Sequence, residues 1–410
     1  MTIAKDPCPI YMAHGAGCRI TDIDGSSYID FHNDFAVLIH GHAFAPVVEA
    51  VTRQITLGTC FANPTLTEIE LAETLCERFP GAQQLRFCNS GTEAVMFAIK
   101  AARAFTGRRK IAKFEGAFHG LYDWAEVSEA SRPESWGPLS APHATPLGAT
   151  PAAVLEEVVP LPFNFIDETR RLIETHAHEL AAVLVCLMPS RAGLVPLDKA
   201  YVQMLREVTA RHGILLIDDE VLNGRLTYAG AAGHYGLEPD LVTLGKIIGG
   251  GLPIGAVAGR REVMAVFDNT GRDPLVPHAG TFSANPLSMV AGQAAMHALT
   301  REAIERLNSL GDRLRNGVAD AARRLNAPFS ITGLGSAFKI HPKRTPPRHY
   351  REAWLDAAET ARLTSLWREL LDSGFMFASH GLGVLSTPMD DDVVDSFVAA
   401  FAQCASRHAP

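Results

Sequence analysis

A single lysine leaves an apolar run and enters a glycine-rich turn at residues 243–251. This segment reads Thr-Leu-Gly-Lys-Ile-Ile-Gly-Gly-Gly, and its lysine is Lys246. The flanking hydrophobic residues predict a confined amine, and confinement or a nearby cation lowers the pKa of a lysine, as an amine nucleophile requires. A surface lysine beside a flexible loop is the simpler alternative, which the apolar neighbours disfavour. The turn is not a P-loop, because Asp240 stands where that motif needs its first glycine and Ile247 where it needs Ser or Thr.

Three acidic residues, Asp218, Asp219 and Glu220, close another strongly apolar run. Carboxylates at the end of a buried strand could bind Mg²⁺, pair with a cationic ring nitrogen or simply cap a helix. An aspartate in such an apolar setting needs a positive partner to stay ionised. No HxxxH motif and no His/Asp cluster accompanies these acids, so we expect no metal site and disfavour a metal-dependent hydrolase.

Two further segments could hold a phosphorylated, planar ligand. Ser90, Gly91 and Thr92 precede a helical pattern, where hydroxyl groups and free backbone N–H groups favour a phosphate site, although an ordinary helix cap is the alternative. Phe118 and His119 lie between Gly116 and Gly120. Phe118 could therefore stack on a planar ring, with a packed turn as the alternative.

The elements that must position these residues alternate along the chain. Short apolar runs at 85–88, 110–114, 182–188, 214–218 and 241–244 are typical of buried strands, and helical patterns lie between them, as at 92–106 and 198–212. This alternation predicts an α/β fold with a mostly parallel sheet between two layers of helices. Ligands bind at the carboxyl ends of such strands, so the four segments should meet there. The stretch 123–162, rich in Pro, Ser, Gly and Ala, predicts a long loop or lid.

The hydrophobic pattern changes after about residue 293. Amphipathic helices are predicted at 301–324 and 352–373, with short strands at 336–341 and 382–386. We therefore predict an N-terminal segment, 1–51, that joins the smaller domain and the active site, a large domain at 52–292, and a small α+β domain at 293–410.

The composition narrows the class of partner. The 410 residues are 47% hydrophobic and 20% charged, which is enough apolar material for a large core, and the net charge of -8 gives no attraction to nucleic acid or an anionic membrane. The longest apolar run, 180–188, is far short of the ~20 residues of a membrane span. Seven scattered cysteines without a CxxC pair, and a first segment without the apolar core of a signal peptide, favour a cytoplasmic protein acting on small molecules.

Taken in this order and spacing, the four segments resemble the class III aminotransferases of pyridoxal-phosphate (PLP) fold type I. The resemblance is nearest to the glutamate-1-semialdehyde 2,1-aminomutases and their β-amino-acid aminotransferase relatives. It extends over nearly the whole chain, from Asp22-Ile-Asp-Gly and Gly41-His42 through His278-Ala-Gly-Thr-Phe-Ser-Ala-Asn-Pro to the C-terminal region. Any single motif could arise by chance, but all of them in register could not easily do so.

The resemblance implies a role for each residue. Lys246 would join the cofactor as a Schiff base, Asp219 would keep its pyridine nitrogen protonated, and Val221 and Phe118 would pack on the two faces of its ring. The remaining implied contacts are with the phosphate (Ser90, Gly91, Thr92, and Thr281 from a neighbouring subunit, hence a homodimer), with the cofactor (His119) and with the substrate (Phe35).

The sequence also departs from the family pattern. Ser190-Arg191 stands where relatives usually have Gly-Asn, and Cys186 stands at a usual glutamate. We hypothesise that Arg191 contacts the phenolic oxygen of the cofactor or binds a substrate carboxylate. His380 replaces an arginine that binds carboxylate in the β-amino-acid relatives, and Asp218 replaces an apolar residue. These changes leave the substrate open.

The resemblance implies an aminotransferase that moves an amino group between an amino acid or amine and a keto acid with ping-pong kinetics. An aminomutase or racemase on the same scaffold is the alternative, and it would turn over without an added keto acid. A non-catalytic PLP-binding module is the alternative from another class. The presence of both Lys246 and Asp219 disfavours it.

Overall fold

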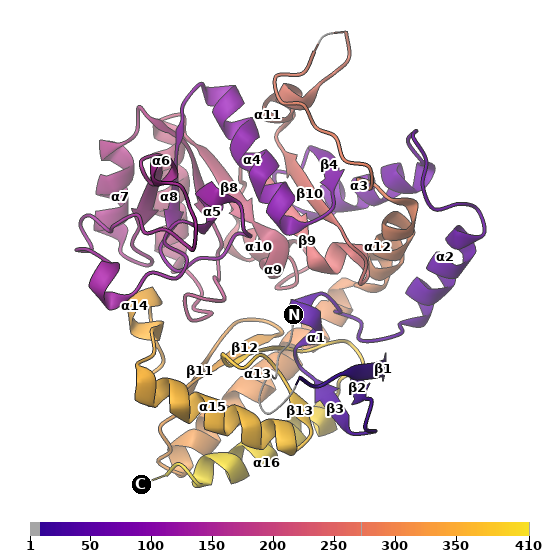
Figure 1. The fold of residues 1–410 in the computed structure, drawn as a ribbon, viewed down its shortest axis with the longest axis vertical. Helices are drawn as coiled ribbons and strands as arrows, with labels where there is room; N and C mark the ends of the chain where they lie inside the picture. The colour runs from indigo at the N-terminus through magenta and orange to yellow at the C-terminus, as the bar shows by residue number, and fades with distance from the viewer. Residues whose placement is uncertain (1–8, 272, 410) are drawn as a thin grey trace.

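The computed structural model describes residues 9–271 and 273–409. The first eight residues, on which the expectation about a signal peptide depends, lie outside them. Figure 1 shows an upper part, in which helices flank a large sheet, and a lower part built from the C-terminal helices together with the first strands of the chain.

The large sheet has seven strands in the order β4-β10-β9-β8-β7-β5-β6. All run parallel except β10, which is antiparallel to both of its neighbours. The five runs predicted as strands are all strands of this sheet. The bounds are β4 (Gln84–Cys88), β5 (Lys110–Phe114), β6 (Val158–Leu161), β7 (Leu180–Val185), β8 (Leu215–Asp219), β9 (Leu241–Gly245) and β10 (Gly255–Gly259).

Two strands escape the sequence pattern. β6 lies inside the stretch predicted as a loop, 123–162, which also holds two short helices. β10 reads Gly-Ala-Val-Ala-Gly, a composition that disfavours strands. Its small residues are needed for close packing, since a Cβ on Gly255 would come within 2.1 Å of the Ser90 carbonyl oxygen. Tertiary contacts therefore override local propensity at this strand.

The sheet is buried on both faces, which explains its continuous apolar runs. On β7, Ala182 and Leu184 pack with helix α4, whereas Val183 and Val185 pack with α7 and α8 on the opposite face. The helices that cover the sheet and its edge are α2 (Ala45–Ile55), α3 (Leu66–Arg78), α4 (Gly91–Thr106), α7 (Ile166–Thr175), α8 (Lys199–Arg211), α10 (Gly230–Tyr235), α11 (Arg261–Met264) and α12 (Pro286–Ala298).

The lower part contains both ends of the described chain. Strand β3 pairs in parallel with β13, so the N-terminal segment lies beside the C-terminal one, as Figure 1 shows. Its elements are β1 (Met12–Ala16), β2 (Arg19–Asp22), β3 (Ser27–Asp30), α13 (Arg301–Arg324), β11 (Ser330–Thr332), β12 (Ala337–His341), α14 (Tyr350–Ala353), α15 (Ala357–Asp372), β13 (Phe375–Met376), β14 (Leu382–Val384) and α16 (Asp391–Ser406).

One predicted helix differs from the structure, and one predicted domain boundary stays untested by it. The predicted helix 352–373 is two helices, because Trp354 is extended and Asp356 starts α15 with a capping box to Glu359. The predicted domain boundary after residue 292 falls inside α12. The division into 1–51, 52–292 and 293–410 therefore stays a prediction.

The short elements complete the chain. They are α1 (Asn33–Ala36), α5 (Asp123–Glu126), α6 (Ala152–Leu155), α9 (Glu220–Asn223) and the 3₁₀ turns η1 (Pro133–Ser135), η2 (Lys246–Gly249) and η3 (Ala265–Phe267). Across the described residues, no helix combines the length and the apolar character that crossing a membrane would take.

Candidate active site

Asp219 ends β8 with an almost fully buried carboxylate. His119 Nδ1 lies 2.7 Å from Oδ2, while Thr243 Oγ1 and the Val221 N–H donate to Oδ1 at 3.0 and 3.1 Å. Since a carboxylate only accepts hydrogen bonds, Nδ1 of His119 carries the ring proton. Three donors hold Asp219, yet neither a lysine nor an arginine of the described chain bonds to it. A cationic ligand could supply the missing charge.

The strand register explains this arrangement. Side chains alternate along β8, so Asp219 shares a face with Ile217, which packs toward α4, and Asp218 shares the opposite face with Leu216. Asp219 is paired with Thr243 on β9, which places the threonine hydroxyl beside the carboxylate. The role of Thr243 cannot be predicted from the sequence motif, because only the pairing of β8 with β9 brings it to Asp219.

His119 is fully buried against Asp219 and stays neutral. Burial lowers the pKa of its imidazole, although the hydrogen bond to Asp219 raises it. Its Nε2 atom has no hydrogen-bond partner among the described residues. His119 therefore acts on Asp219 as a fixed dipole rather than as a counter-charge.

Lys246 follows β9 in a strained backbone conformation. Its φ is 52°, a left-handed value that costs a non-glycine residue of order 1–3 kcal/mol and that clusters at functional sites. Burial lowers the pKa of the amine, while the charges of Asp219, Cys186 and Asp34 raise it. The side chain is only partly covered by the protein. Lys246 is thus a confined amine beside Asp219, as the sequence predicted.

The N-terminus of α4 forms the phosphate-like end of the site. Ser90 is the N-cap, and its hydroxyl accepts from the Glu93 N–H at 3.1 Å while its carbonyl accepts from the Ala94 N–H. The N–H groups of Gly91 and Thr92 have no carbonyl partner within the helix. Two backbone donors and the positive end of a 16-residue helix therefore remain for an anion.

Glycines let these segments approach one another. A Cβ on Gly91 would come within 2.9 Å of Val221 Cγ1, and a Cβ on Gly120 would lie 2.4 Å from Thr92 Oγ1. The Phe118–His119 loop thus lies against the start of α4 at Thr92, and Val221 packs against the same helix start at Gly91. The structure brings together Lys246 and all the predicted cofactor residues except one: Ser90, Gly91, Thr92, Phe118, His119, Asp219 and Val221.

Arg191 lies next to Phe118, with its guanidinium carbon 4.7 Å from the centre of the phenyl ring. It also forms an ion pair with the buried Glu129, and half of the arginine side chain remains exposed. Burial raises the pKa of Glu129, and the charges of Arg191 and Lys113 lower it. Glu129 belongs to no recognisable motif, so its role cannot be predicted from the sequence.

Phe35 belongs to a left-handed turn rather than to a regular helix. Residues 33–36, drawn as α1, all have positive φ values, and the Phe35 ring lies 4.2 Å from that of His32. His380 lies in the exposed turn between β13 and β14. Figure 1 shows α1, which carries Phe35, at the top of the lower part, below the large sheet.

Lys113 is a site residue that sequence reasoning missed. It is completely buried on β5, and its amine donates to the carbonyl groups of Phe114, Ala117 and Val127 at 3.2, 3.1 and 2.7 Å. Burial lowers its pKa to about 7, although Glu129 and Glu115 raise it. Lys113 fastens both ends of the loop that carries Phe118 and His119. The position of a lysine in a strand shows which face of the sheet it lies on, but not whether helices cover that face. The burial of Lys113 could therefore not be predicted from the sequence.

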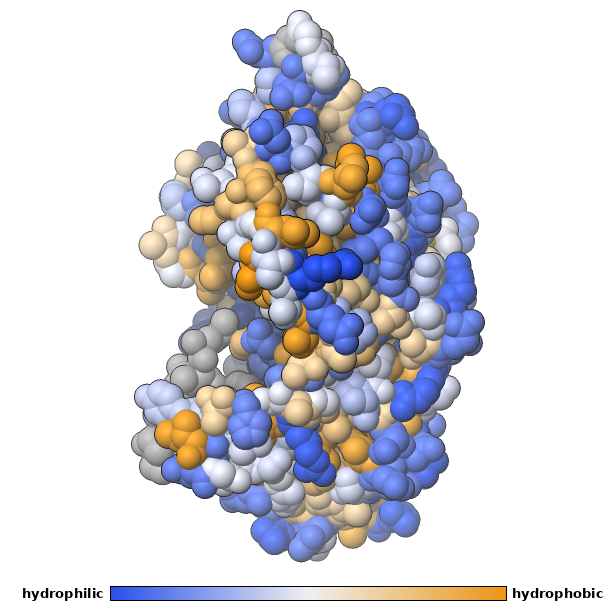
Figure 2. Space-filling view, turned by 90° about the vertical axis from the view of Figure 1, so that its right-hand side faces the viewer, coloured by the Kyte–Doolittle hydropathy of each residue, from blue (hydrophilic) through white to orange (hydrophobic). Residues whose placement is uncertain are grey.

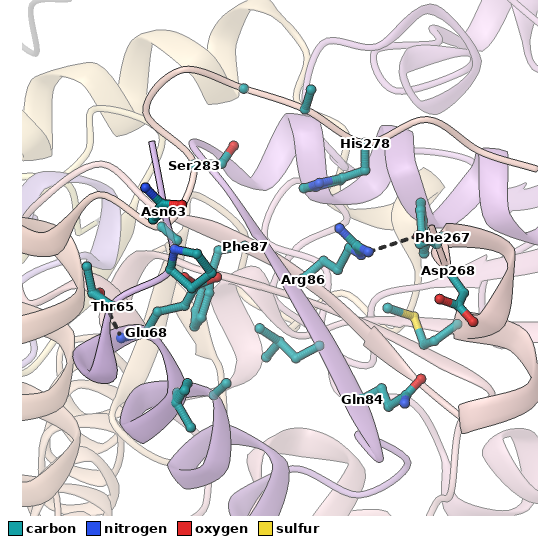
Figure 3. Close-up of a pocket in the computed structure, with 18 of the residues that line it drawn as sticks. Asn63, Thr65, Glu68, Gln84, Arg86, Phe87, Phe267, Asp268, His278 and Ser283 are labelled. Atoms are coloured by element: carbon teal, nitrogen blue, oxygen red, sulfur yellow. Dashed lines mark hydrogen bonds between the residues drawn. The ribbon is translucent and has the colours of Figure 1, made fainter. Parts of the chain in front are cut away.

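Thr281 is the predicted cofactor residue that the chain does not bring to the others. It lines a cavity of about 1380 Å³ between α3, β4 and the segment 278–286. Figure 3 shows this cavity, with Arg86 and His278 on one side and Thr65 and Glu68 on the other. Neither Lys246 nor Asp219 is among its lining residues.

Asp218 points away from this site into the opposite layer. It is fully buried, and burial together with the charge of Glu220 holds its pKa well above the usual range. Asp218 is therefore protonated, and the neighbouring Glu220 carboxylate accepts from the N–H groups of Ala231 and Ala232 at 3.1 and 2.7 Å. Within the described ranges, no three His, Cys, Asp or Glu residues form a group suited to a metal ion.

The residues present fit PLP. A buried carboxylate supplied only with neutral donors suits a protonated ring nitrogen, a confined lysine suits an aldehyde, and an unfilled helix N-terminus suits a phosphate. These three features come from β8, β9 and α4, at one edge of the sheet.

Comparison with known proteins agrees with this geometry. The family model for class-III aminotransferases matches residues 1–398. A glutamate-1-semialdehyde 2,1-aminomutase of Methanothermobacter thermautotrophicus is 41% identical over 370 residues, covering 90% of this chain and 85% of the relative.

Solved structures share the fold over almost the whole chain. An ω-transaminase from Sphaerobacter thermophilus superposes with a TM-score of 0.96 at 50% identity, covering 99% of this chain and 93% of the other. A β-phenylalanine aminotransferase from Variovorax paradoxus gives 0.86 at 34% identity, covering 98% and 88%. A transaminase with PLP bound gives 0.90 at 39% identity, covering 99% and 92%. The expected α/β architecture of PLP fold type I is confirmed, and the chain belongs to the class-III aminotransferases, a family of PLP-dependent enzymes.

Proposed function

We propose that the enzyme is an aminotransferase that moves an amino group between an amino acid or amine and a keto acid. The observation that carries the proposal is the arrangement at the ends of β8 and β9. There the buried Asp219 carboxylate, fixed by three donors, acts on the amine of Lys246. The N-terminus of α4, whose first backbone N–H groups have no partner within the helix, lies at the same end of the sheet.

PLP, when bound, supplies an aldehyde and an electron-withdrawing ring that stabilises negative charge at the substrate Cα. Asp219 would bind the protonated ring nitrogen, and the neutral His119 would hold the carboxylate in place. Ser90, Gly91 and Thr92 would bind the phosphate, with Phe118 and Val221 on the two sides of the ring. Lys246 is the group that would bind the aldehyde carbon.

Lys246 would also move the proton of the reaction. Once an amino substrate has displaced it, its amine would be free to take the proton from the substrate Cα as general base. As general acid it would deliver that proton to the cofactor carbon on the other side of the substrate nitrogen, two bonds away. Burial lowers its pKa, which leaves a larger fraction of the amine unprotonated and able to accept. Lys113 would hold the loop of Phe118 in place through its hydrogen bonds to three backbone carbonyl groups.

The proposal includes a homodimer in which Thr281 of one subunit reaches the phosphate of the other. Its support is an exposed apolar surface around Thr281: Phe282, Leu275, Phe61 and Leu57 are all more than half exposed. Figure 2 looks onto the side of the molecule that carries α2 and α3, where hydrophobic side chains gather. Exposed apolar patches of this kind mark protein contacts.

An aminomutase is the second candidate. Its support is the 41% identity to a glutamate-1-semialdehyde 2,1-aminomutase, against the 50% identity to an ω-transaminase. The two reactions differ in one requirement: a mutase keeps the amino group and needs no second carbonyl substrate.

The decisive experiment is turnover of a panel of amino donors by the holoenzyme, with and without a keto acid. The proposal expects a carbonyl product and conversion of the bound cofactor to its amine form, with continued turnover only when a keto acid is present. Turnover of glutamate 1-semialdehyde without any acceptor would instead establish the mutase. Borohydride reduction followed by peptide mapping should place a pyridoxyl label on Lys246, and a label elsewhere would refute the assignment.

A further inference from the structure

A group of donor side chains beside the active site takes no part in the roles proposed above. Arg191 follows β7, Lys339 lies on β12, His380 lies in the turn before β14, and His32 follows β3. We call these four residues the donor cluster. They come from both parts of the molecule and meet near the Phe118 loop.

Backbone geometry brings the members together. The Lys339 amine donates to the Ser190 carbonyl at 3.0 Å, directly before Arg191. Lys339 is paired with Leu382 on β14, and the Ile340 N–H donates to the Gly381 carbonyl at 3.0 Å, so His380 lies beside this strand. The Val384 N–H donates to the Phe31 carbonyl at 2.7 Å, so His32, the next residue, lies beside β14.

The charges of the cluster are poorly balanced. The pKa of Lys339 is lowered to about 8 by burial and by the charge of Arg191, and no carboxylate offsets this. Partial desolvation of the His380 ring, together with the charges of Lys339 and Arg191, lowers its pKa, although the residue keeps an exposed surface. Glu129 is the acid that pairs with Arg191, and half of the arginine side chain stays exposed beyond that contact. The cluster therefore has N–H donors and positive charge left over.

His32 supplies an independent indication of a ligand. Its Nδ1 accepts from the Phe35 N–H at 3.2 Å, so the ring proton of the neutral imidazole lies on Nε2. The side chain belongs to a residue only 6% exposed, and Nε2 has no partner in the described part of the chain. A buried donor without an acceptor costs about 1–3 kcal/mol, which a ligand oxygen would recover.

The donor cluster borders the reacting groups. Arg191 lies over the Phe118 ring, whose neighbour His119 bonds to Asp219. Asp34, two residues after His32, is close enough for its charge to raise the pKa of Lys246. An anion bound by the cluster would therefore lie close to Lys246 and Asp219.

We propose that Arg191 and Lys339 bind a carboxylate of the amino substrate, with His32 and His380 completing the site, so that the enzyme prefers amino acids to simple amines. This inference rests on the aminotransferase function proposed above. Guanidinium geometry suits a carboxylate bidentately, and the amine of Lys339 adds a second charge at its side.

The test compares matched donors in which a methyl group replaces the carboxylate: 3-aminobutanoate against 2-aminobutane, and alanine against 2-aminopropane, each as both enantiomers where they exist. The rate of the single-turnover half-reaction and the apparent Kd are followed by the absorbance of the bound cofactor. In Arg191→Gln and Lys339→Met, we expect the preference for the acid over the amine to fall about 10- to 100-fold. Equal losses on acid and amine would overturn the inference.

A binding measurement separates this inference from the proposed reaction. Calorimetry with 3-phenylpropanoate, a carboxylate that has no amino group, should give a Kd that rises at least ~10-fold in both variants. If the native holoenzyme bound this acid with no difference from the variants, the donor cluster would not be a carboxylate site, whatever the reaction. If it bound the acid as expected but transaminated no donor, only the proposed function would fail.

A control variant and three further measurements accompany these variants. Arg323→Gln removes an exposed arginine of α13 and should leave the acid preference unchanged. A pH titration of the cofactor absorbance tests the other role considered for Arg191: a shift in that titration by Arg191→Gln, with unchanged acid binding, would assign the arginine to the phenolic oxygen and refute the proposal. Arg191→Lys should restore part of the acid preference, and thermal melting confirms that each variant is folded.

Discussion

The two faces of the sheet at the end of β8 treat neighbouring aspartates in opposite ways. Asp219 faces α4 and receives three hydrogen bonds, which keep its carboxylate ready for a cation. Asp218 faces the other layer, where burial and Glu220 keep it protonated. Because side chains alternate across a strand, Asp219 lies at the active site whereas its neighbour Asp218 lies in the opposite layer, where its burial lowers the stability of the fold. Changes on the first face should alter the reaction, and changes on the second should alter folding alone.

The largest effect is expected from Lys246→Ala. Removing the amine deletes both the link to the cofactor and the proton carrier, so the rate should fall by about 10³-fold or more. Borohydride should then fix no pyridoxyl group to residue 246. Lys100→Ala, which removes an exposed lysine of α4, serves as the control and should keep normal activity. Near-normal turnover by Lys246→Ala would refute the assignment of the active site to the α4 face of the sheet.

Asp219→Asn comes next. The amide keeps the size of the side chain but loses the charge that would balance a protonated ring nitrogen, so kcat should fall roughly 10²- to 10³-fold. The absorbance and affinity of bound PLP should change as well, and equilibrium dialysis measures the second. A loss no larger than that of the neighbouring Asp218→Asn variant would show that the two faces do not differ.

Lys113→Met tests how the α4 face is held in shape. Three buried carbonyl groups lose their donor, so the free energy of unfolding should fall by about 1–3 kcal/mol. The Phe118 loop should loosen and PLP affinity should fall several-fold. Lys110→Met is a matched control on the same strand, because it breaks only a partly exposed pair with Glu179 at 2.9 Å. Equal effects of the two variants, by thermal melting and PLP titration, would contradict a positioning role.

Asp218→Asn should change stability without changing the reaction. The folded protein keeps Asp218 protonated, whereas the unfolded chain loses that proton near pH 4. Native stability is therefore lost as pH rises above about 4, by up to about 1.4 kcal/mol per pH unit. Asparagine avoids this loss, so the variant should melt higher than the native protein at pH 8 and nearly equally at pH 4. Urea unfolding at both values measures it; a variant less stable at pH 8 would contradict a protonated Asp218.

Much of the site could be predicted from the sequence because it depends on strand ends. Lys246, Asp219, Ser90 and Phe118 each follow an apolar run, and parallel strands bring their carboxyl ends to one edge. Strands β6 and β10 could not be predicted in the same way, because β6 contains a proline and β10 begins and ends with glycine, and both residue types are rare in strands. Helix 352–373 was predicted as continuous because the break at Trp354 depends on a capping box rather than on periodicity.

The residues that support the site had no signal in the sequence. Thr243, Lys113, Glu129 and Lys339 become relevant only through strand pairing, burial on both faces of the sheet, or contact between distant segments. The same is true of Arg191, whose type was visible but whose neighbours, Phe118 and Glu129, were not.

The sequence by itself determined the chemistry available to this protein: a lysine after a strand, an aspartate at the end of another, and a hydroxyl-rich helix start, in an order that resembles the class-III aminotransferases. Local periodicity and residue type carry that information, since they act within a few residues. Only the tertiary structure decided which aspartate faces the site, which lysine holds its loop and which donors remain without partners. Those outcomes depend on sheet register and on packing between segments that are distant in the sequence, as between Asn33 and Val384, which are 351 residues apart.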